Sequence, residues 1–303
     1  MTGDKIPAFV NRDAGTADDA SEALSKDGSF RVERIPPNEL ANRVRHAVES
    51  GAERILVAGG DGSIATAASV LCGKSCELAI LPGGTLNHLA QDLGLPTDPD
   101  DAVRVASGAT TRYIDVAKVN GRVFLNTSSV GAYVTYVRTR ERLEKRLGYW
   151  LASIIAGFRI LARLRTFRVT LEVDGVEQEY VTPLVFVGVG ERELKLPKLG
   201  ARVENGRRGL HVMVVRSRSA GRTLALAFAA AAKGVHAVSR TPAMQSFIVD
   251  HLRIEPRAKV VAWNVGVDGE IVRVTPPLEY RLVREALKVV VAAPSTAEMV
   301  AER

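Results

Sequence analysis

Residues 54–96 read RILVAGGDGSIATAASVLCGKSCELAILPGGTLNHLAQDLGLP and contain two glycine-rich turns. The largely apolar runs at 54–58 and 77–81 predict strands, and helix-forming stretches at 63–71 and 87–93 follow the turns. Glycine lets a backbone approach an anion closely, and a helix N-terminus offers it free N–H groups. Neighbouring parallel strands end at one edge of a sheet, where α/β sheets bind ligands. We therefore expect the two turns to hold a triphosphate between them.

A simpler interpretation stays open for each turn on its own. GGDGS at 59–63 lacks the Gly-Lys-Ser/Thr ending of a Walker A loop and the GxGxxG spacing of a dinucleotide site. In the simpler interpretation the first turn is only a tight connection from strand to helix. Thr85 and Asn87 in the second turn would likewise serve only as helix caps. Two such turns about 20 residues apart, within the spacing of one βαβ unit, favour the ligand site.

Strand and helix signals alternate up to about residue 119, a pattern typical of a parallel sheet in an α/β layer. Besides the helices after the two turns, helices are expected at 17–26, from Asn38 to residue 50, and after Asp98. Asn38 and Asp98 are the expected N-caps, and Pro99 occupies the first helical position, which proline favours.

Beyond residue 119 the pattern changes to that of an antiparallel, β-rich domain. Asn-Gly at 120–121 and Asp-Gly at 174–175 and 268–269 lie between β-branched runs and predict hairpin turns. The last apolar run, 287–292, suits a strand buried on both faces, and we expect it to return to the first domain. The other expected strands are 124–127, 167–173, 184–189, 210–215, 247–254 and 260–263, with helices at 140–165 and 222–238.

Composition limits the partners and the compartment. The net charge of +7 favours anionic partners such as nucleotides or phospholipid headgroups, whereas 5% aromatic residues and scattered basic residues disfavour single-stranded nucleic acid. The start of the chain lacks a signal-peptide pattern, and the longest uncharged apolar stretches, 147–158 and 224–232, are shorter than the roughly 20 residues that span a bilayer. Cys72 and Cys76 lack further zinc ligands nearby and are expected to be reduced thiols. We expect a soluble, cytoplasmic protein that contacts membranes only peripherally.

GGDGS at 59–63 and PGGTLNHLAQDLGLP at 82–96 resemble the catalytic region of the diacylglycerol kinase family, which also includes the sphingosine kinases and bacterial lipid kinases. That family's pattern is GGDGT, then a GTxND-like segment, then a late DGE, which VGVDGE at 265–270 supplies here. VNRDAG at 10–15 is similar to the family's NPxSG turn, with Arg12 in place of the proline. Residues 112–133 are similar to its crossing into the second domain.

The resemblance implies a protein of the α/β class with two domains and a cleft between them. Residues 1–119 with 280–303 would form a three-layer α/β domain that binds ATP, and residues 120–279 an antiparallel β-sandwich that binds the lipid. It also implies Mg²⁺ and the phosphorylation of a hydroxyl of a diacylglycerol-like lipid at the membrane surface. Asp268 matches the family's proposed general base and Glu270 its acidic partner. The implied nucleotide-binding residues are Asn11, Gly59, Gly60, Asp61, Gly62, Ser63, Gly84, Thr85 and Asn87.

For Mg²⁺, the family's pattern points to Asp61, the aspartate of the GTxND segment, and Asp115, but the middle position here is His88. Mg²⁺ prefers carboxylate oxygens and water, so imidazole is a poor replacement. Either Asp61 and Asp115 hold the ion through waters, or the ion binds elsewhere. Some bacterial lipid kinases carry a further metal near residues 187–208, where this chain offers Glu204 and Asn205 among arginines. No second metal is expected there.

Residues 138–168 are densely basic around the apolar LGYWLASIIAGF at 147–158, which suits a helix lying on the anionic inner face of the membrane. Packing of that apolar face on the β-rich domain accounts for the pattern equally well. Two other functions stay open: an NAD-kinase-like kinase of a soluble alcohol, and a nucleotide- or lipid-binding protein without catalysis, which Arg12 and His88 suggest. A homodimer paired through an exposed edge strand also stays open.

Overall fold

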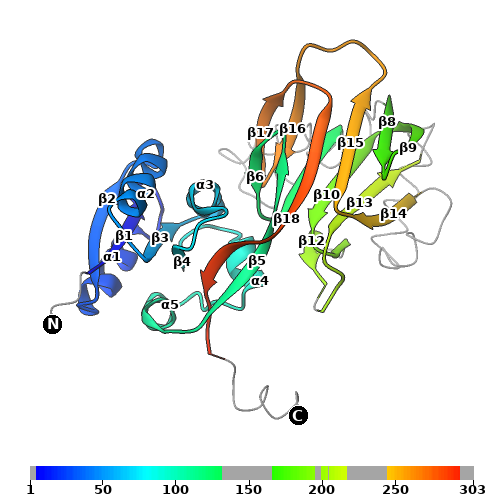
Figure 1. The fold of residues 1–303 in the computed structure, drawn as a ribbon. Helices are drawn as coiled ribbons and strands as arrows, with labels where there is room; N and C mark the ends of the chain where they lie inside the picture. Colours follow the sequence, from blue (N-terminus) through cyan, green and yellow to red (C-terminus); the bar gives the residue numbers. More distant parts are fainter. Residues whose placement is uncertain (1–4, 132–165, 195–198, 204, 217–243, 294–303) are drawn as a thin grey trace, which may run out of the picture. The chain divides into compact units, whose positions relative to one another are not determined.

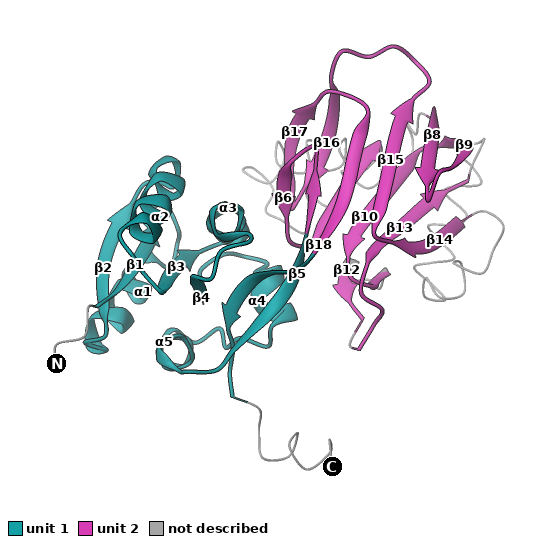
Figure 2. Ribbon diagram, in the orientation of Figure 1, with its two compact units in different colours: residues 1–116, 284–303 teal, residues 117–283 magenta. Residues whose placement is uncertain are grey.

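The structure, a computed structural model, describes residues 5–131, 166–194, 199–203, 205–216 and 244–293 (Figure 1). The chain divides into two compact units, and each has a hydrophobic core of its own. The first unit contains residues 1–116 and 284–303, and the second contains residues 117–283 (Figure 2).

A parallel sheet forms the centre of the first unit. Its strands are β1 (Ile6–Asn11), β2 (Phe30–Ile35), β3 (Arg54–Gly59) and β4 (Glu77–Pro82), in the spatial order β2-β1-β3-β4. The end of the last strand, β18 (Leu278–Val290), pairs in parallel with β4, with Val289 opposite Leu78. The apolar run near the end of the chain therefore adds a strand to the sheet of the first unit.

Helices cover both faces of this sheet. They are α1 (Ala17–Lys26), α2 (Leu40–Glu49), α3 (Asp61–Leu71), α4 (His88–Asp92) and α5 (Pro99–Ser107). The helix α1 packs on α5 and β2, and α2 packs on α3 and β1.

Alternation along the strands explains the two covered faces. Ala8, Leu56 and Ala79 share one core with Leu24 of α1, whereas Ile55 and Leu78, one residue out of phase, are equally buried. A strand buried on both faces reads as a continuous apolar run, as the sequence does here. The expected three-layer α/β fold is confirmed.

The start of α2 differs from the expectation. Asn38 lies inside a short 3₁₀ turn, Pro37–Glu39 (η1), that leads directly into the helix, and no side chain caps α2. The fixed φ of Pro37 lets the helical turn begin earlier than a cap at Asn38 would allow. At α5 the expectation is confirmed, because the Asp98 carboxylate accepts a hydrogen bond of 3.0 Å from the N–H of Asp101.

Two sheets form the second unit. The first sheet is antiparallel. Its strands, in chain order, are β7 (Thr127–Gly131), β10 (Leu184–Val189), β13 (Leu210–Val215), β14 (Met244–Val249), β16 (Trp263–Val267) and β17 (Glu270–Val274). In space they follow the order β14-β13-β10-β7-β16-β17. In the second sheet the start of β18 pairs with β15 (His251–Pro256), which pairs with β8 (Phe167–Val173), followed by β9 (Val176–Thr182). The strand β5 (Thr111–Val119) pairs with β18 and with β6 (Arg122–Phe124). A separate two-stranded ribbon joins β11 (Arg192–Leu194) to β12 (Leu199–Arg202).

Side chains from both sheets make one core in the second unit, as in a β-sandwich. Leu171 and Leu252 from one sheet lie in the same buried cluster as Val187 and Val212 from the other. Tyr280 is fully buried in this core, and its hydroxyl lies 3.0 Å from the Ser128 hydroxyl oxygen. The expected antiparallel sandwich is confirmed, whereas the helices expected at 140–165 and 222–238 lie outside the described residues.

All three expected hairpin turns are confirmed. Asn120-Gly121, Asp174-Gly175 and Asp268-Gly269 each form a two-residue connection in which both residues have positive φ. Asn, Asp and Gly are the residues that tolerate this geometry, so these dipeptides mark the turns reliably.

Three strands of the second unit have limits that differ from the expected ones. The strand expected at 124–127 is broken, because β6 ends at Phe124 and β7 begins at Thr127. The run 247–254 bends at Asp250, where the chain leaves β14 in one sheet and enters β15 in the other. Residues 260–262 form a loop, and β16 begins only at Trp263.

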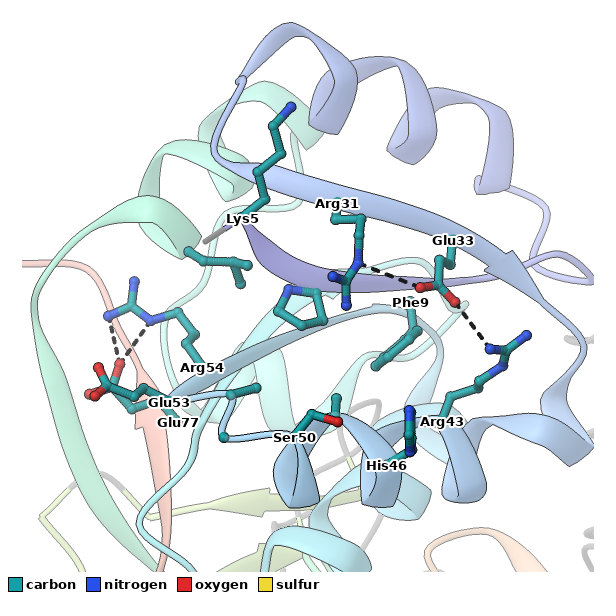
Figure 3. Close-up of a pocket in the computed structure, with 15 residues that line it drawn as sticks. Lys5, Phe9, Arg31, Glu33, Arg43, His46, Ser50, Glu53, Arg54 and Glu77 are labelled. Carbon is teal, nitrogen blue, oxygen red and sulfur yellow. Dashed lines mark hydrogen bonds and ion pairs between the residues drawn. The ribbon is translucent and has the colours of Figure 1, made fainter. Parts of the chain in front are cut away.

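A pocket of about 820 Å³ lies where the strands of the first unit begin (Figure 3). Ion pairs cross its lining: Glu33 lies between the guanidinium groups of Arg31 and Arg43, 3.7 and 3.6 Å away. At its other side Arg54 donates to the Glu77 carboxylate at 2.6 Å. This is the edge of the sheet opposite to the two glycine turns.

Glu77 is a largely buried member of these pairs. Its carboxylate also lies 2.9 Å from Nζ of Lys288, on the returning strand. Burial by itself would raise the pKa of the Glu77 carboxyl, but the hydrogen bonds and charges of Lys288 and Arg54 outweigh it and hold the pKa below its ordinary value. The ionised carboxylate therefore stabilises the fold above the unfolded-state pKa, about 4.3, and this contribution is lost as the pH falls through the folded-state pKa.

We predict that Glu77→Gln lowers the free energy of unfolding by about 1–2 kcal/mol at pH 7. The difference from the parent protein should shrink as the pH falls below about 4, because the parent carboxylate then becomes protonated. Urea unfolding followed by circular dichroism at pH 7 and at low pH measures both values. Glu49→Gln, an exposed glutamate on α2, serves as the control and should change neither. A deficit of equal size at both pH values would show that the charge of Glu77 is not the cause.

Candidate active site

The two glycine turns touch each other at the carboxyl edge of the first unit's sheet. Gly59 ends β3 opposite Pro82 of β4, and the N–H of Gly83 donates to the carbonyl of Gly59 at 2.9 Å. A Cβ atom on Gly60 would lie 3.2 Å from Cα of Gly84, and one on Gly84 would lie 2.7 Å from Cα of Gly60. A Cβ atom on Gly84 therefore could not fit, and one on Gly60 would fit only if the facing backbone moved by a few tenths of an ångström.

Asn87 holds the second turn in shape. Its side-chain oxygen accepts from the N–H of Gly84 at 2.8 Å, and its side-chain nitrogen donates to the Gly84 carbonyl at 2.7 Å. Asn87 itself has a φ of 48°, the left-handed region that asparagine tolerates better than most residues. The Thr16 hydroxyl adds a bond of 3.3 Å to the Gly83 carbonyl. Asn87 therefore braces the turn rather than capping α4, which has no side-chain cap.

Asn11 and Ser63 connect the end of β1 to the first turn. The Asn11 amide nitrogen donates to the hydroxyl oxygen of Ser63 at 3.0 Å, and Ser63 is buried. A Cβ atom on Gly59 would lie 2.8 Å from that hydroxyl oxygen, so a third glycine allows this close approach. The Asn11 side-chain oxygen also accepts from the N–H of Asp13 at 3.0 Å, which shapes the turn after β1.

The N-terminus of α3 opens from the first turn. Ser63 and Ile64 donate to the carbonyl of Gly60, so the N–H groups of Asp61 and Gly62 lie ahead of the first helical hydrogen bond. A Cβ atom on Gly84 would lie 3.6 Å from the Asp61 nitrogen, and its absence leaves space beside that donor. Free N–H groups and the helix dipole both favour an anion at this position.

One buried oxygen at this site has no partner. Oδ1 of Asp61 is buried and accepts no hydrogen bond. A buried carboxylate oxygen without a donor is costly, and a cation that binds there removes the cost. Among the described residues no three His, Cys, Asp or Glu side chains gather into a metal cluster. The single oxygen of Asp61 therefore fits an ion such as Mg²⁺ that takes most of its ligands from water and phosphate.

The sequence also pointed to three other residues of the first unit, Asp115, Thr85 and His88. Asp115 is buried on β5, and its Oδ1 accepts from the N–H of Glu285 at 2.9 Å. Thr85 and His88 are exposed.

Asp268 and Glu270 belong to the second unit, at the hairpin between β16 and β17. Both carboxylate oxygens of Asp268 accept backbone hydrogen bonds: Oδ2 from Leu125 at 2.7 Å, and Oδ1 from Asn126 at 2.8 Å and Thr127 at 3.0 Å. These donors explain why no strand continues through residues 125–126, since their N–H groups bind a side chain instead of a neighbouring strand. The exposed Glu270 pairs with Arg122 at 2.9 Å.

The carboxylate of Asp268 keeps one acceptor position. A carboxylate accepts about four hydrogen bonds, and three are made here, so the open lone pair is on Oδ2. Burial raises the pKa of Asp268, and the three backbone N–H groups oppose that rise. A carboxylate with a raised pKa is a stronger proton acceptor than an exposed aspartate.

The sequence did not indicate two supporting features, one in each unit. Thr16 lies outside every glycine motif, and only the resemblance of residues 10–15 to a family turn pointed to its neighbourhood. The second feature is the set of N–H groups at 125–127 that bind Asp268. Backbone groups of this kind leave no pattern in the amino-acid sequence, so the sequence could not predict them.

Comparison with known proteins gives the class to which these motifs belong. The family model described as "Diacylglycerol kinase catalytic domain" matches residues 5–119. The chain is 31% identical over 163 residues to a Mycobacterium tuberculosis protein named "Diacylglycerol kinase", covering 50% of this chain and 51% of the relative. It is 30% identical over 158 residues to the "Probable lipid kinase YegS-like" of Cronobacter sakazakii, covering 50% and 52%.

Solved structures extend the likeness of fold to nearly the whole chain. A diacylglycerol kinase of Bacillus anthracis has a TM-score of 0.67 and 19% identity, covering 97% of this chain and 98% of the other. A second structure from that organism has a TM-score of 0.73 and 21% identity, covering 95% and 97%. At these identities the structures show a likeness of fold alone.

Residues 5–119 are therefore similar to the diacylglycerol kinase catalytic domain, as their motifs predicted. The chain spans about half the length of the curated relatives that it matches. In the described residues no helix is long and apolar enough to cross a bilayer.

We predict that Gly84→Ala lowers the free energy of unfolding by about 1–3 kcal/mol, because the new methyl group would displace the first turn. Gly28→Ala is the matched control, since a Cβ at Gly28 meets no atom within 4 Å. The control should change stability by less than about 0.5 kcal/mol. Urea unfolding of both variants measures the difference, and equal values would mean that the two turns are not in close contact in solution.

Proposed function

We propose that this protein is an ATP-dependent lipid kinase that transfers the γ-phosphate of ATP to a hydroxyl of a diacylglycerol-like lipid at a membrane surface. The observation that carries the proposal is the contact of Gly60 with Gly84 beside the unpartnered Asp61 carboxylate. The match of residues 5–119 to the diacylglycerol kinase catalytic domain and the names of the relatives support the same reaction.

The two turns would bind the phosphates of ATP. The N–H groups of Asp61 and Gly62 at the start of α3 would donate to phosphate oxygens, and the missing Cβ atoms of Gly60 and Gly84 would let those oxygens approach the backbone. Asn87 and Asn11 would hold the turns in place through the hydrogen bonds that they already make. Phosphoryl transfer depends mainly on positioning and charge, so rigid turns are the contribution that this unit can make.

Asp61 would hold Mg²⁺ through Oδ1, and Asp115 would take part through water. The ion when bound would neutralise the charge that develops on the phosphates during transfer. His88 is exposed at the start of α4. In this proposal it does not take over the metal-binding role of the aspartate that the family carries at its position.

Asp268 would accept the proton of the lipid hydroxyl through the open lone pair of Oδ2. The three backbone donors fix the carboxylate in one orientation, and its raised pKa suits proton transfer. A lipid hydroxyl is a very weak acid, so Asp268 would orient it and take its proton as the new P–O bond forms and the bond from the γ-phosphorus to ADP breaks. Glu270 would act as the acidic partner near the nucleotide.

The basic segment at 138–168, almost all of it outside the described residues, would lie against the anionic inner face of the membrane. Peripheral binding would bring the kinase to a substrate that does not leave the bilayer.

Incubation of the protein with γ-labelled ATP and Mg²⁺ should label a lipid when total bacterial lipid or diacylglycerol is supplied. Mass spectrometry of the product should show the parent lipid plus one phosphate. A parallel incubation with NAD should give no labelled product. Label in NAD would instead indicate a kinase of a soluble alcohol, and ATP binding without turnover on any acceptor would indicate a protein without catalysis.

We predict that Asp61→Asn lowers lipid phosphorylation at least about a hundredfold, because the amide cannot supply the negative charge that a cation requires. The free energy of unfolding should not fall, since Oδ1 has no hydrogen bond to lose. Asp19→Asn, an exposed aspartate on α1, is the control and should retain full activity. Near-normal turnover of Asp61→Asn would remove this residue from the mechanism.

Asp268→Asn should lower turnover about a hundredfold, as Asp61→Asn does, but it should also lower the stability of the fold. Its amide nitrogen would face the N–H of Leu125 where the carboxylate now accepts a hydrogen bond. Activity of this variant is therefore expressed per folded molecule, with the folded fraction taken from circular dichroism. Full turnover per folded molecule would exclude Asp268 as the proton acceptor.

A further inference from the structure

The loop at residues 257–262 exposes two adjacent valines to solvent. It connects β15 to β16, with the sequence RAKVVA, and Val261 is 89% exposed while Val260 is 40% exposed. Within the described part of the chain only two other large hydrophobic side chains are this exposed, Tyr113 and Val176. The β-branched pair predicts a strand, yet the structure leaves it unpaired in a loop. Exposed neighbouring apolar side chains commonly mark a contact surface.

Basic side chains accompany these valines. Arg257 and Lys259 are exposed in the same loop, and Arg168 is exposed next to it, since the N–H of Arg257 donates to the Arg168 carbonyl at 3.0 Å. Arg257 pairs with Glu179 at 2.7 Å, whereas Lys259 has no acidic partner among the described residues. Valine beside unpaired basic charge is the combination that suits an anionic lipid surface.

Val176 provides the comparison within the same unit. It is 69% exposed at the hairpin between β8 and β9, but its exposed neighbours are Asp174 and Glu177. An acidic surface repels an anionic bilayer, so exposure of an aliphatic side chain is not by itself enough.

The loop lies beside the points where the basic segment joins the described chain. Trp263, which follows the loop, packs edge-on against Phe167, with ring centroids 5.3 Å apart. A Cβ atom on Gly131 would lie 2.5 Å from the same Phe167 ring. The chain thus leaves the described part at Gly131 and returns near Phe167, both next to this loop. The segment between them carries the LGYWLASIIAGF stretch and most of the clustered arginines.

We propose that residues 257–262 form a membrane-insertion loop of this protein. Val260 and Val261 enter the interfacial layer of an anionic bilayer, while Lys259 contacts lipid phosphates beside them. The proposal rests on the proposed lipid kinase function and specifies the part of the second unit that meets the membrane.

Co-sedimentation with vesicles of phosphatidylglycerol and phosphatidylcholine tests the loop. Val261→Asp should weaken binding about tenfold or more, because an ionised side chain cannot enter the interfacial layer. Val176→Asp is the matched control, with the same substitution at a similarly exposed valine, and should bind like the parent protein. Equal binding of all three proteins, or equal loss in both variants, would overturn the proposal.

A depth measurement distinguishes insertion from simple attraction of charge. Val261→Trp should be quenched by vesicles that contain brominated phosphatidylcholine, and Val176→Trp should not be quenched beyond the parent signal. Light scattering of the parent protein without lipid tests the alternative that the valines join two copies. A dimer that Val261→Asp dissociates would overturn the membrane proposal.

Turnover of a short-chain, water-dispersed diacylglycerol separates this proposal from the proposed function. Val261→Asp should phosphorylate that substrate at the parent rate and lose activity only on vesicles. If the parent protein binds vesicles through the loop but phosphorylates no lipid, the proposed function fails while the insertion loop stands. If Val261→Asp is equally active on vesicles, the insertion loop fails and the proposed function stands.

Discussion

The structure of the first unit depends on a contact between two backbones, where Gly60 and Gly84 approach too closely for any side chain to lie between them. This contact requires β3 and β4 to be neighbours and parallel, and it fixes where α3 and the turn before α4 begin. Thr16, Asn87 and the Asn11–Ser63 pair all brace the same point. In the proposed function, binding of phosphate at this edge would depend mainly on backbone geometry, and Asp61 would be the side chain that adds charge.

The sequence predicted the features that have a local physical cause. Glycine pairs after apolar runs located the two turns, and Asn-Gly and Asp-Gly located three hairpins, because few residues tolerate positive φ. Prediction from the sequence failed where a residue far along the chain, or a second sheet, determines the local structure. The run at 124–127 breaks because Asp268, far along the chain, takes its N–H groups, and the run at 247–254 bends because its halves belong to different sheets. The prediction that Asn38 is an N-cap was wrong, because the helical turn already begins at Pro37.

Asp268 has a structural task and, in the proposed mechanism, a catalytic one. Its carboxylate closes the gap between β6 and β7 by accepting three backbone hydrogen bonds, so the local fold depends on it. The same bonds hold its remaining lone pair in one direction, which a proton acceptor requires. A residue of this kind cannot be replaced without some loss of structure, whereas Asp61, with a free oxygen, can be.

The returning strand β18 has a consequence for biosynthesis. Its last residues complete the sheet next to β4, yet they emerge from the ribosome only after the whole second unit has been made. Until then β4 has an unpaired side, and the nascent N-terminal segment exposes strand edges that could pair with other chains. The second unit, which is continuous from residue 117 to 283, is free to fold first. The order of folding is thus expected to run opposite to the order of synthesis.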